Sequence, residues 1–212
     1  RHCHLHRSAG QGGFFVTCDN QQTDEDMAVL TEEKKFTVQE YLEWEGFEPS
    51  FIYELINGEI VKKTSPHPQH QIICANMFRH FDAFVQSQKL GLILFAPVDV
   101  FLDEHNALVP DLLFIAEARK SFLIDNSVEG APDLVVEILS PSTAKYDRGD
   151  KLKVYRKHEV REYWLIDPKL KSVEVYVYRN GDYDLDFLET EKGTVQSSVL
   201  PGFVLSVEAI FN

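Results

Sequence analysis

Two acidic residues stand beside apolar segments that are typical of strands. Glu137 lies within the apolar run 134–139, and Asp111, preceded by a proline, opens the apolar segment 112–115. A carboxylate enclosed by Leu, Val and Ile loses on the order of several kcal/mol of hydration unless a cation or a site compensates it. Two such carboxylates on adjoining strands would repel each other and raise at least one pKa, and a shared Mg²⁺ or Mn²⁺ would relieve that repulsion. The pair therefore predicts a metal site with hard oxygen ligands.

A second Pro-Asp pair, ending at Asp133, is nearer to Glu137 in the sequence. Four residues along a strand span ~13 Å, whereas each ligand of one metal ion must approach it to within ~2.0–2.6 Å. Asp133 cannot share an ion with Glu137 on that geometry, so we expect Asp111 to be the partner.

A divalent cation held by two carboxylates can activate water and neutralise the charge that develops on a phosphate, which makes phosphodiester hydrolysis the leading chemistry. Such a site also needs a lysine to orient water or stabilise the phosphate. Leu139, two residues beyond Glu137 on the same strand face, cannot supply it. Lys151 shares a helix face with Tyr155 and can reach inward, so it is the predicted lysine. Two nearby lysines are weaker candidates, Lys145 and Lys153.

The elements that must position these side chains are readable from turns and periodicity. Asn57-Gly58 between the segments 51–56 and 59–61 predicts a β-hairpin with Glu54 on its first strand. Apolar positions in 67–89 fall on one side of a long helix. The strand of Glu137, the helix of Lys151 and the segment 162–167 predict a β-α-β unit with a parallel crossover.

Further segments complete the predicted fold. Thr37 and Glu40 have the spacing of a capping box and predict a short helix. Segments 92–95 and 98–102, with the strands of Asp111 and Glu137, predict a mixed sheet in the middle of the protein. A second hairpin follows around Asn180-Gly181, and its edge in 173–187 could support a homodimer. The predicted fold class is α/β, with a mixed central β-sheet flanked by helices and additional hairpins.

The first residues have a different composition. A His- and Cys-containing tract, a Gly-rich stretch and a polar segment precede Met27. We expect residues 1–30 to be a tag-derived or disordered extension, and residues 31–212 to form one domain. The chain has neither an apolar run long enough to span a membrane nor an apolar secretory signal at its start, and its three cysteines are too scattered for a disulfide framework, so we expect a cytoplasmic protein.

The charge is divided unevenly along the chain. Lys plus Arg total 21 and Asp plus Glu total 34, which gives 21 − 34 = −13 and argues against generic nucleic-acid binding through a basic surface. Residues 145–161 reverse the balance, with seven Lys or Arg against three acids. That run is either a solvated helix face or a surface that contacts phosphates.

Taken together, these motifs resemble a known family. Glu54 in YELINGEIV, His70 after SPHPQ, Asp111 in VPDLLFI, Glu137 in PDLVVEILSPST, and Asp147 and Lys151 in YDRGDKLKVY, followed by EYWLIDP, are similar to the Uma-two family of restriction-endonuclease-like proteins, which is abundant in cyanobacteria. The resemblance runs from about Phe36 to Phe211 and extends to the PD-(D/E)xK nuclease superfamily.

The resemblance implies a restriction-endonuclease-like core and a Mg²⁺- or Mn²⁺-dependent endonuclease acting on DNA. It implies that Asp111 and Glu137 hold the metal, that Glu54 is an additional acidic site residue, and that Lys151 is the displaced motif lysine. His70 and Arg148 are further residues that could contact phosphate or water.

Two other functions stay open from the sequence. A nuclease fold could be retained as a non-catalytic module that binds nucleic acid or protein, since Leu139 and the net charge of −13 are unusual for a nuclease. A metal-dependent hydrolase of small phosphate esters is the third. Glu137 and Lys151 could also form a structural ion pair without any catalytic role.

Overall fold

The computed structural model describes residues 4–7, 14–17, 34–64 and 66–212. It divides into two units, Arg1–Glu33 and Lys34–Asn212. In the first unit, β1 (His4–Arg7) pairs antiparallel with β2 (Phe14–Thr17). The rest of the predicted 1–30 extension lies outside the described residues.

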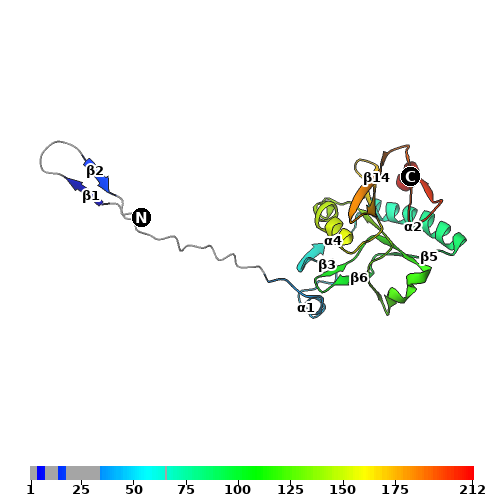
Figure 1. Cartoon of the computed structure of the whole chain (residues 1–212), viewed down its shortest axis with the longest axis horizontal. Helices are drawn as coiled ribbons and strands as arrows, with labels where there is room; N and C mark the ends of the chain where they lie inside the picture. The colour runs from blue at the N-terminus through cyan, green and yellow to red at the C-terminus, as the bar shows by residue number, and fades with distance from the viewer. Residues whose placement is uncertain (1–3, 8–13, 18–33, 65) are drawn as a thin grey trace. The chain divides into compact units, whose positions relative to one another are not determined.

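The second unit contains both helices and strands (Figure 1). Its helical elements are α1 (Val38–Leu42), α2 (Pro68–Gln88), the 3₁₀ segment η1 (Glu117–Phe122), α3 (Ala144–Tyr146), the π-helical turn η2 (Asp147–Lys151), α4 (Leu152–Lys157) and α5 (Val207–Phe211). Its strands are β3 (Ile52–Ile56), β4 (Glu59–Lys63), β5 (Gly91–Phe95), β6 (Asp99–Asp103), β7 (Asn106–Leu108), β8 (Leu112–Ala116), β9 (Leu123–Ile124), β10 (Ser127–Glu129), β11 (Leu134–Ile138), β12 (Glu162–Asp167), β13 (Ser172–Arg179), β14 (Asp182–Thr190), β15 (Thr194–Gln196) and β16 (Val204–Ser206).

Most of these strands form two sheets. The central sheet has the order β14-β13-β12-β11-β8-β5, and the hairpin sheet has the order β4-β3-β7-β6-β10-β9. In the central sheet β11 and β12 are parallel and the other neighbours are antiparallel, which confirms the predicted mixed sheet and the β-α-β crossover. Segment 98–102 differs from the prediction: it is β6, and it pairs with β7 and β10 in the hairpin sheet.

Strand β11 of the central sheet is buried on both faces, so side-chain alternation decides what each of its residues contacts. Leu134, Val136 and Ile138 of β11 belong to the core cluster that includes the buried face of α2 and part of α5. Val135 and Leu139 belong to the cluster that includes α4 and residues of the hairpin sheet. Glu137 alternates with Ile138 and therefore faces α4 and the hairpin sheet.

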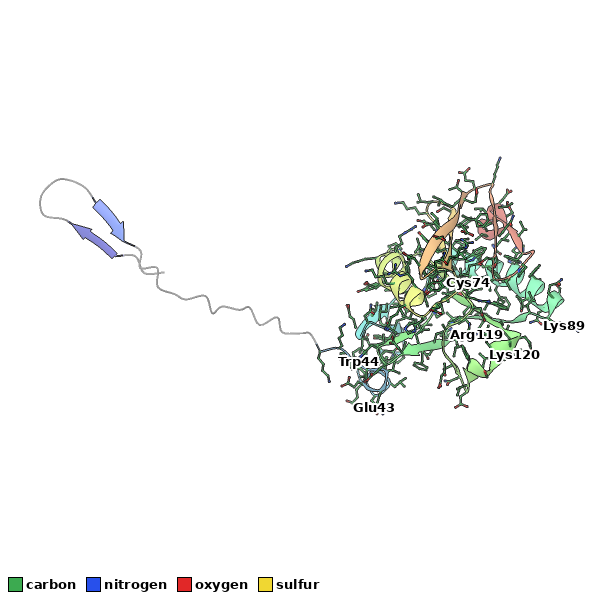
Figure 2. All side chains as sticks on the ribbon, in the orientation of Figure 1. Glu43, Trp44, Cys74, Lys89, Arg119 and Lys120 are labelled. Carbon is green, nitrogen blue, oxygen red and sulfur yellow. The ribbon has the colours of Figure 1, made fainter. Side chains whose placement is uncertain are left out.

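Several local sequence signals form the structures that they predict. Thr37 and Glu40 form a capping box at α1. Asn57 and Gly58, both with positive φ, form the turn between β3 and β4. The helix predicted for 67–89 is α2, which ends where Lys89 takes the left-handed conformation. Figure 2 shows Glu43 and Trp44, just after α1, at one end of this unit and Lys89 at another. Among the described residues, every helix is too short or too polar to cross a lipid bilayer.

Candidate active site

The acidic residues predicted for the site come from both sheets. Glu54 lies on β3 of the hairpin sheet, and Glu137 lies on β11 of the central sheet. Asp111 precedes β8, and because Val136 pairs with Leu112, one further step of the register sets Asp111 beside Glu137. Asp111 and Glu137 line the same cavity, whose volume is 770 Å³. The structure thus brings the two predicted metal ligands together.

One oxygen of Asp111 is held by two protein donors. The Ile138 N–H donates to Oδ2 at 2.7 Å, and His70 Nε2 lies 3.1 Å from the same oxygen. Burial alone would raise the pKa of Asp111, but the hydrogen bond with His70 and the charge of Lys63 outweigh burial and hold this pKa below its ordinary value. The other oxygen, Oδ1, has no hydrogen bond or ion pair within the described residues and remains available to a cation.

His70 lies in the first turns of α2 and also lines the cavity. Its Nε2 is used by Asp111, while its Nδ1 is buried and has no hydrogen-bond partner among the described side chains and backbone. With Nε2 donating to Asp111, Nδ1 is an acceptor that a water molecule could satisfy. His70 therefore lies at the cavity, and its predicted contact with phosphate or water stays a prediction.

Glu137 is held in the same way as Asp111. Lys151 Nζ lies 3.0 Å from Oε1, and the Tyr155 hydroxyl donates to that same oxygen at 3.1 Å. Burial raises the pKa of Glu137 to about 8, because the neighbouring lysines offset burial only in part and the charges of Asp147 and Asp111 raise it further. Oε2 has no hydrogen bond or ion pair within the part of the chain that is described.

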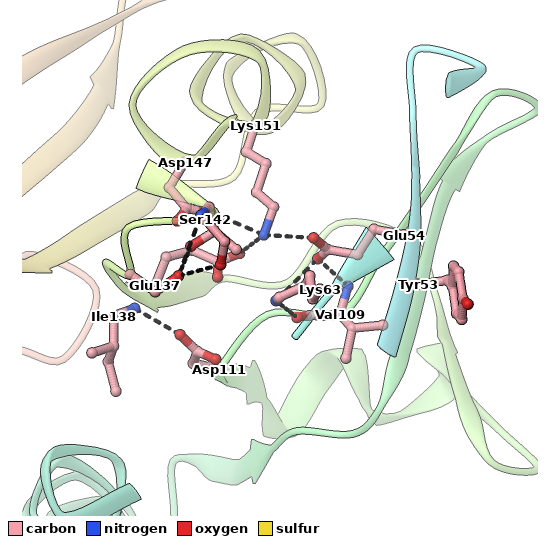
Figure 3. Close-up of polar contacts among 12 residues, drawn as sticks. Tyr53, Glu54, Lys63, Val109, Asp111, Glu137, Ile138, Ser142, Asp147 and Lys151 are labelled. Carbon is pink, nitrogen blue, oxygen red and sulfur yellow. Dashed lines mark hydrogen bonds and ion pairs between the residues drawn. The ribbon is translucent and has the colours of Figure 1, made fainter. Parts of the chain in front are cut away.

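Lys151 is the centre of a buried ion cluster (Figure 3). Its Nζ lies 2.9 Å from Glu54 Oε2, 3.0 Å from Glu137 Oε1 and 3.1 Å from Asp147 Oδ1. The contact with Asp147 is an ion pair without hydrogen-bond geometry. Desolvation lowers the pKa of Lys151, but the three acids outweigh it and raise the pKa well above its ordinary value. Lys151 is 0% exposed and does not line the cavity.

Lys63, on β4, is a site residue that the sequence analysis missed. Its Nζ donates to the Val109 carbonyl at 3.1 Å and lies 3.6 Å from Glu54 Oε1. Among the described residues that line the cavity, Lys63 is the one Lys or Arg. The hairpin register could have revealed it: Glu54 pairs with Val61, so Lys63, two residues further along, faces the same side.

Glu54 completes the link between the two lysines. Its Oε1 accepts the Val109 N–H at 2.8 Å and its Oε2 lies against Lys151. Burial would raise the pKa of Glu54, yet the charges of Lys151 and Lys63 hold it below its ordinary value. Because both oxygens are already used, Glu54 serves to hold the two lysines in place.

The charges around the cavity do not balance within the protein. Two lysines, Lys63 and Lys151, face four buried carboxylates, so the formal sum over these groups is 2 − 4 = −2. The four carboxylates are those of Glu54, Asp111, Glu137 and Asp147. A buried deficit of this size favours a bound cation or a bound proton. The raised pKa of Glu137 means that a proton on this carboxyl supplies part of the missing positive charge.

The residues fit a divalent cation that binds few protein ligands. Asp111 and Glu137 both line the cavity, and each has one oxygen without a described protein partner. The described residues contain no group of three His, Cys, Asp or Glu side chains arranged around a common point, which does not suit a closed zinc site. Mg²⁺ typically binds one or two carboxylates and keeps several waters, and this pair of carboxylates matches that requirement.

Arg148, predicted as a further phosphate contact, is not among the residues that line the cavity. Its guanidinium lies 2.7 Å from Glu174 Oε1 and 3.7 Å from Asp167 Oδ2. Other basic side chains of η2 and α4 are also paired with acids: Lys153 with Asp150, Arg156 with Asp182, and Lys157 with Asp103. These partners reduce the positive potential of the run 145–161, so this helix offers less attraction to phosphates than its sequence suggests.

Asp133, which strand geometry excluded as a ligand, has a separate role. Its Oδ1 lies 2.9 Å from both Arg119 and Arg161, and its Oδ2 accepts the Ala116 N–H at 2.8 Å. Asp133 therefore ties η1 and the start of β12 to the far end of β11.

Comparison with known proteins places this site in context. Residues 38–208 match the family model described as "Uma2: Putative restriction endonuclease". Two uncharacterized proteins of Synechocystis sp. are similar: sll1609 is 29% identical over 71% of this chain and 85% of its own length, and slr1290 is 25% identical over 71% of this chain and 77% of its own length. A crystal structure titled as a "putative nuclease belonging to DUF820" from Anabaena variabilis superposes with a TM-score of 0.69 at 24% identity, covering 83% of this chain and 97% of the other. That likeness shows the fold.

Proposed function

The chain belongs to the Uma2 family of restriction-endonuclease-like proteins, and from this premise we propose that it is a Mg²⁺-dependent endonuclease that hydrolyses DNA phosphodiester bonds. The observation that carries the proposal is the pair Asp111 and Glu137, which line one cavity with one oxygen of each free of described protein partners. A divalent cation bound there would supply Lewis-acid stabilisation of the phosphate and a more acidic water. Mn²⁺ would fit the same ligands.

Each neighbouring side chain has a role that its contacts support. Lys63 would contact a non-bridging oxygen of the scissile phosphate, because it lines the same cavity as Asp111 and Glu137. His70 would hold Asp111 through Nε2 and accept a hydrogen bond from a water molecule through its buried Nδ1. Lys151, which is fully buried, would act by holding Glu54 and Glu137 in place.

The charge of this chain indicates that strong DNA binding requires a second copy or another partner. The net charge is −13 and the basic side chains of α4 are largely paired with acids, so binding by one copy should be weak and salt-sensitive. β14 forms an edge of the central sheet and exposes Leu185 and Leu188 at 48% and 58%. We include a homodimer through this edge in the proposal, since two copies would supply two cutting sites.

The central experiment is DNA cleavage by protein whose fold is verified by circular dichroism. Supercoiled plasmid, single-stranded oligonucleotides and branched duplexes are incubated with Mg²⁺, with Mn²⁺ or with a chelator. We expect cleavage with either metal and none with the chelator. A folded protein that binds Mn²⁺ but cuts none of these substrates would refute the proposed activity.

A non-catalytic nucleic-acid-binding or protein-binding module is the second candidate. It is favoured by one observation, namely that Lys151 is 0% exposed and held by three acids. Such a module has no need of a cation between Asp111 and Glu137. Calorimetric titration with Mn²⁺ therefore separates the two candidates.

Asp111→Asn is expected to weaken Mn²⁺ binding by at least about tenfold. The amide keeps an oxygen that can accept the Ile138 N–H, so the backbone contact survives while the negative charge is lost. Asp125→Asn is the matched control, because Asp125 is exposed in a turn at φ 49°, a conformation that asparagine tolerates. Equal Mn²⁺ affinity in both variants and the wild type would place the metal elsewhere.

Lys63→Met is expected to lower the rate of cleavage about tenfold without weakening Mn²⁺ binding. Methionine retains most of the apolar length of the side chain and removes the charge proposed to contact the phosphate. Lys62→Met is the control, because Lys62 points to the other side of β4, where it pairs with Glu48 and lies over the Phe51 ring. Single-turnover cleavage and Mn²⁺ calorimetry measure the two effects, and a loss of Mn²⁺ affinity in Lys63→Met would argue for a structural role.

A further inference from the structure

Tyr155 donates a buried hydrogen bond to a predicted metal ligand. The residue lies on α4, is 0% exposed, and its hydroxyl donates to Glu137 Oε1 at 3.1 Å. Lys151 contacts that same oxygen at 3.0 Å. Two donors on one oxygen fix the rotation of the carboxylate, so the opposite oxygen is the one presented to the cavity.

We propose that Tyr155 is a positioning residue of the metal site, which orients Glu137 so that Oε2 is available to the cation. The inference rests on the proposed metal-dependent function and adds a residue to it. Asp111 is arranged in parallel: the Ile138 N–H and His70 occupy Oδ2 and leave Oδ1 to the cavity. Donors behind metal ligands set ligand orientation and are worth about 10–100-fold in metal affinity.

Tyr155 allows this orientation to be tested separately from the fold. Lys151 contacts three carboxylates, so its replacement disturbs the whole ion cluster. The Tyr155 hydroxyl has one described hydrogen-bond partner, Glu137. The Tyr155 ring packs against the Tyr163 ring at a centroid distance of 5.1 Å, and phenylalanine preserves that packing.

Tyr163 provides a closely matched control. It is also 0% exposed in the same core cluster, and its hydroxyl donates to the Asp147 carbonyl at 2.9 Å. Tyr163→Phe therefore removes the buried hydroxyl of the neighbouring ring without touching a carboxylate oxygen. Both variants should lose a comparable amount of stability, because in each a buried acceptor loses its donor.

The experiment is Mn²⁺ titration of the full chain by calorimetry, without substrate, for the wild type and for Tyr155→Phe, Tyr163→Phe and Asp111→Asn. We expect Mn²⁺ affinity to fall about 10–100-fold in Tyr155→Phe and to stay within about twofold of the wild type in Tyr163→Phe. The rise in melting temperature on adding saturating Mn²⁺ gives a second readout. We expect this rise to be smaller than in the wild type for Tyr155→Phe and unchanged for Tyr163→Phe.

The outcomes separate this inference from the function on which it rests. Wild-type affinity in Tyr155→Phe, with binding lost in Asp111→Asn, would overturn the role of Tyr155 and leave the metal site intact. Equal weakening in both tyrosine variants would also overturn it, because the cause would then be general loosening of the core. A wild type that binds no Mn²⁺ would overturn the proposed function together with the inference.

Discussion

Glu137→Gln is expected to reduce DNA cleavage by about 10²–10³-fold while making the metal-free protein more stable near pH 8.5. The loss of activity follows because the amide is a poor ligand for Mg²⁺ and leaves Asp111 as the remaining charged ligand in the cavity. The gain in stability follows because the Glu137 carboxylate is buried, and burial outweighs its attraction to Lys151 enough to raise its pKa to about 8. A neutral side chain avoids that cost.

The pH dependence fixes the sign of this effect. In the unfolded chain a glutamate loses its proton near its ordinary pKa of 4.5, whereas folded Glu137 keeps it up to a pKa of about 8. Between these values the native state binds one more proton than the unfolded state, so the free energy of unfolding falls as pH rises. Each pH unit is worth up to about 1.4 kcal/mol, and after allowance for coupling among the buried charges we expect a difference of roughly 2–4 kcal/mol between variant and wild type, reached by about pH 8.

Urea denaturation across about pH 6 to 9 measures this difference, with and without Mg²⁺. Added Mg²⁺ should stabilise the wild type most at the upper end of that range and should not stabilise Glu137→Gln, because a ligand stabilises only the state that binds it. Glu117→Gln is the control, since Glu117 is exposed on η1 and pairs with Lys120. Parallel pH profiles for wild type and Glu137→Gln would contradict the assignment of the bound proton to Glu137.

This trade of stability for function is consistent with the arrangement of the whole cavity. A buried acid that only holds other side chains in place would be expected to have a depressed pKa, as Glu54 does. Glu137 is instead left with a raised pKa although Lys151 contacts it. Strongly raised pKa values beside an open cavity are typical of functional groups, and here the group that relieves the cost is the proposed cation.

The sequence predicted the convergence of Asp111 and Glu137 because strand parity and spacing are local properties. The Asn57-Gly58 turn predicted the hairpin that carries Glu54. The helix between β11 and β12 predicted that these two strands are parallel. These steps require the period of a strand and the chemistry of a turn. The predicted family and α/β fold are confirmed by the match over residues 38–208 and by the structural neighbour.

Features that depend on distant partners escaped the sequence analysis. The basic run 145–161 was read without knowing that Asp103 and Asp182 would lie against α4. β6 was placed in the wrong sheet because its partner β7 has three residues, too few to show a period. These are tertiary facts, and no local pattern encodes them. Lys63 is different, because the register of the Asn57-Gly58 hairpin already puts it on the same face as Glu54.

Lys151→Met is expected to lower the free energy of unfolding by about 3–5 kcal/mol, because breaking a buried ion cluster leaves uncompensated charges. Glu54, Glu137 and Asp147 would lose their shared cation, and each is 1% exposed. The deficit should shrink at low pH, since protonated carboxylates no longer need a partner.

Lys153→Met is the matched control for this substitution. Lys153 is two residues away, exposed and paired with Asp150 at 3.2 Å, and surface pairs of this kind are worth about 0–1 kcal/mol. Chemical denaturation of both variants measures the difference, and Glu54→Gln added to Lys151→Met should recover part of the loss by removing one unpaired charge. If Lys151→Met instead kept wild-type stability and lost cleavage, the fold would not need the ammonium. The buried ammonium would then act directly on water or phosphate, contrary to the structural role expected here.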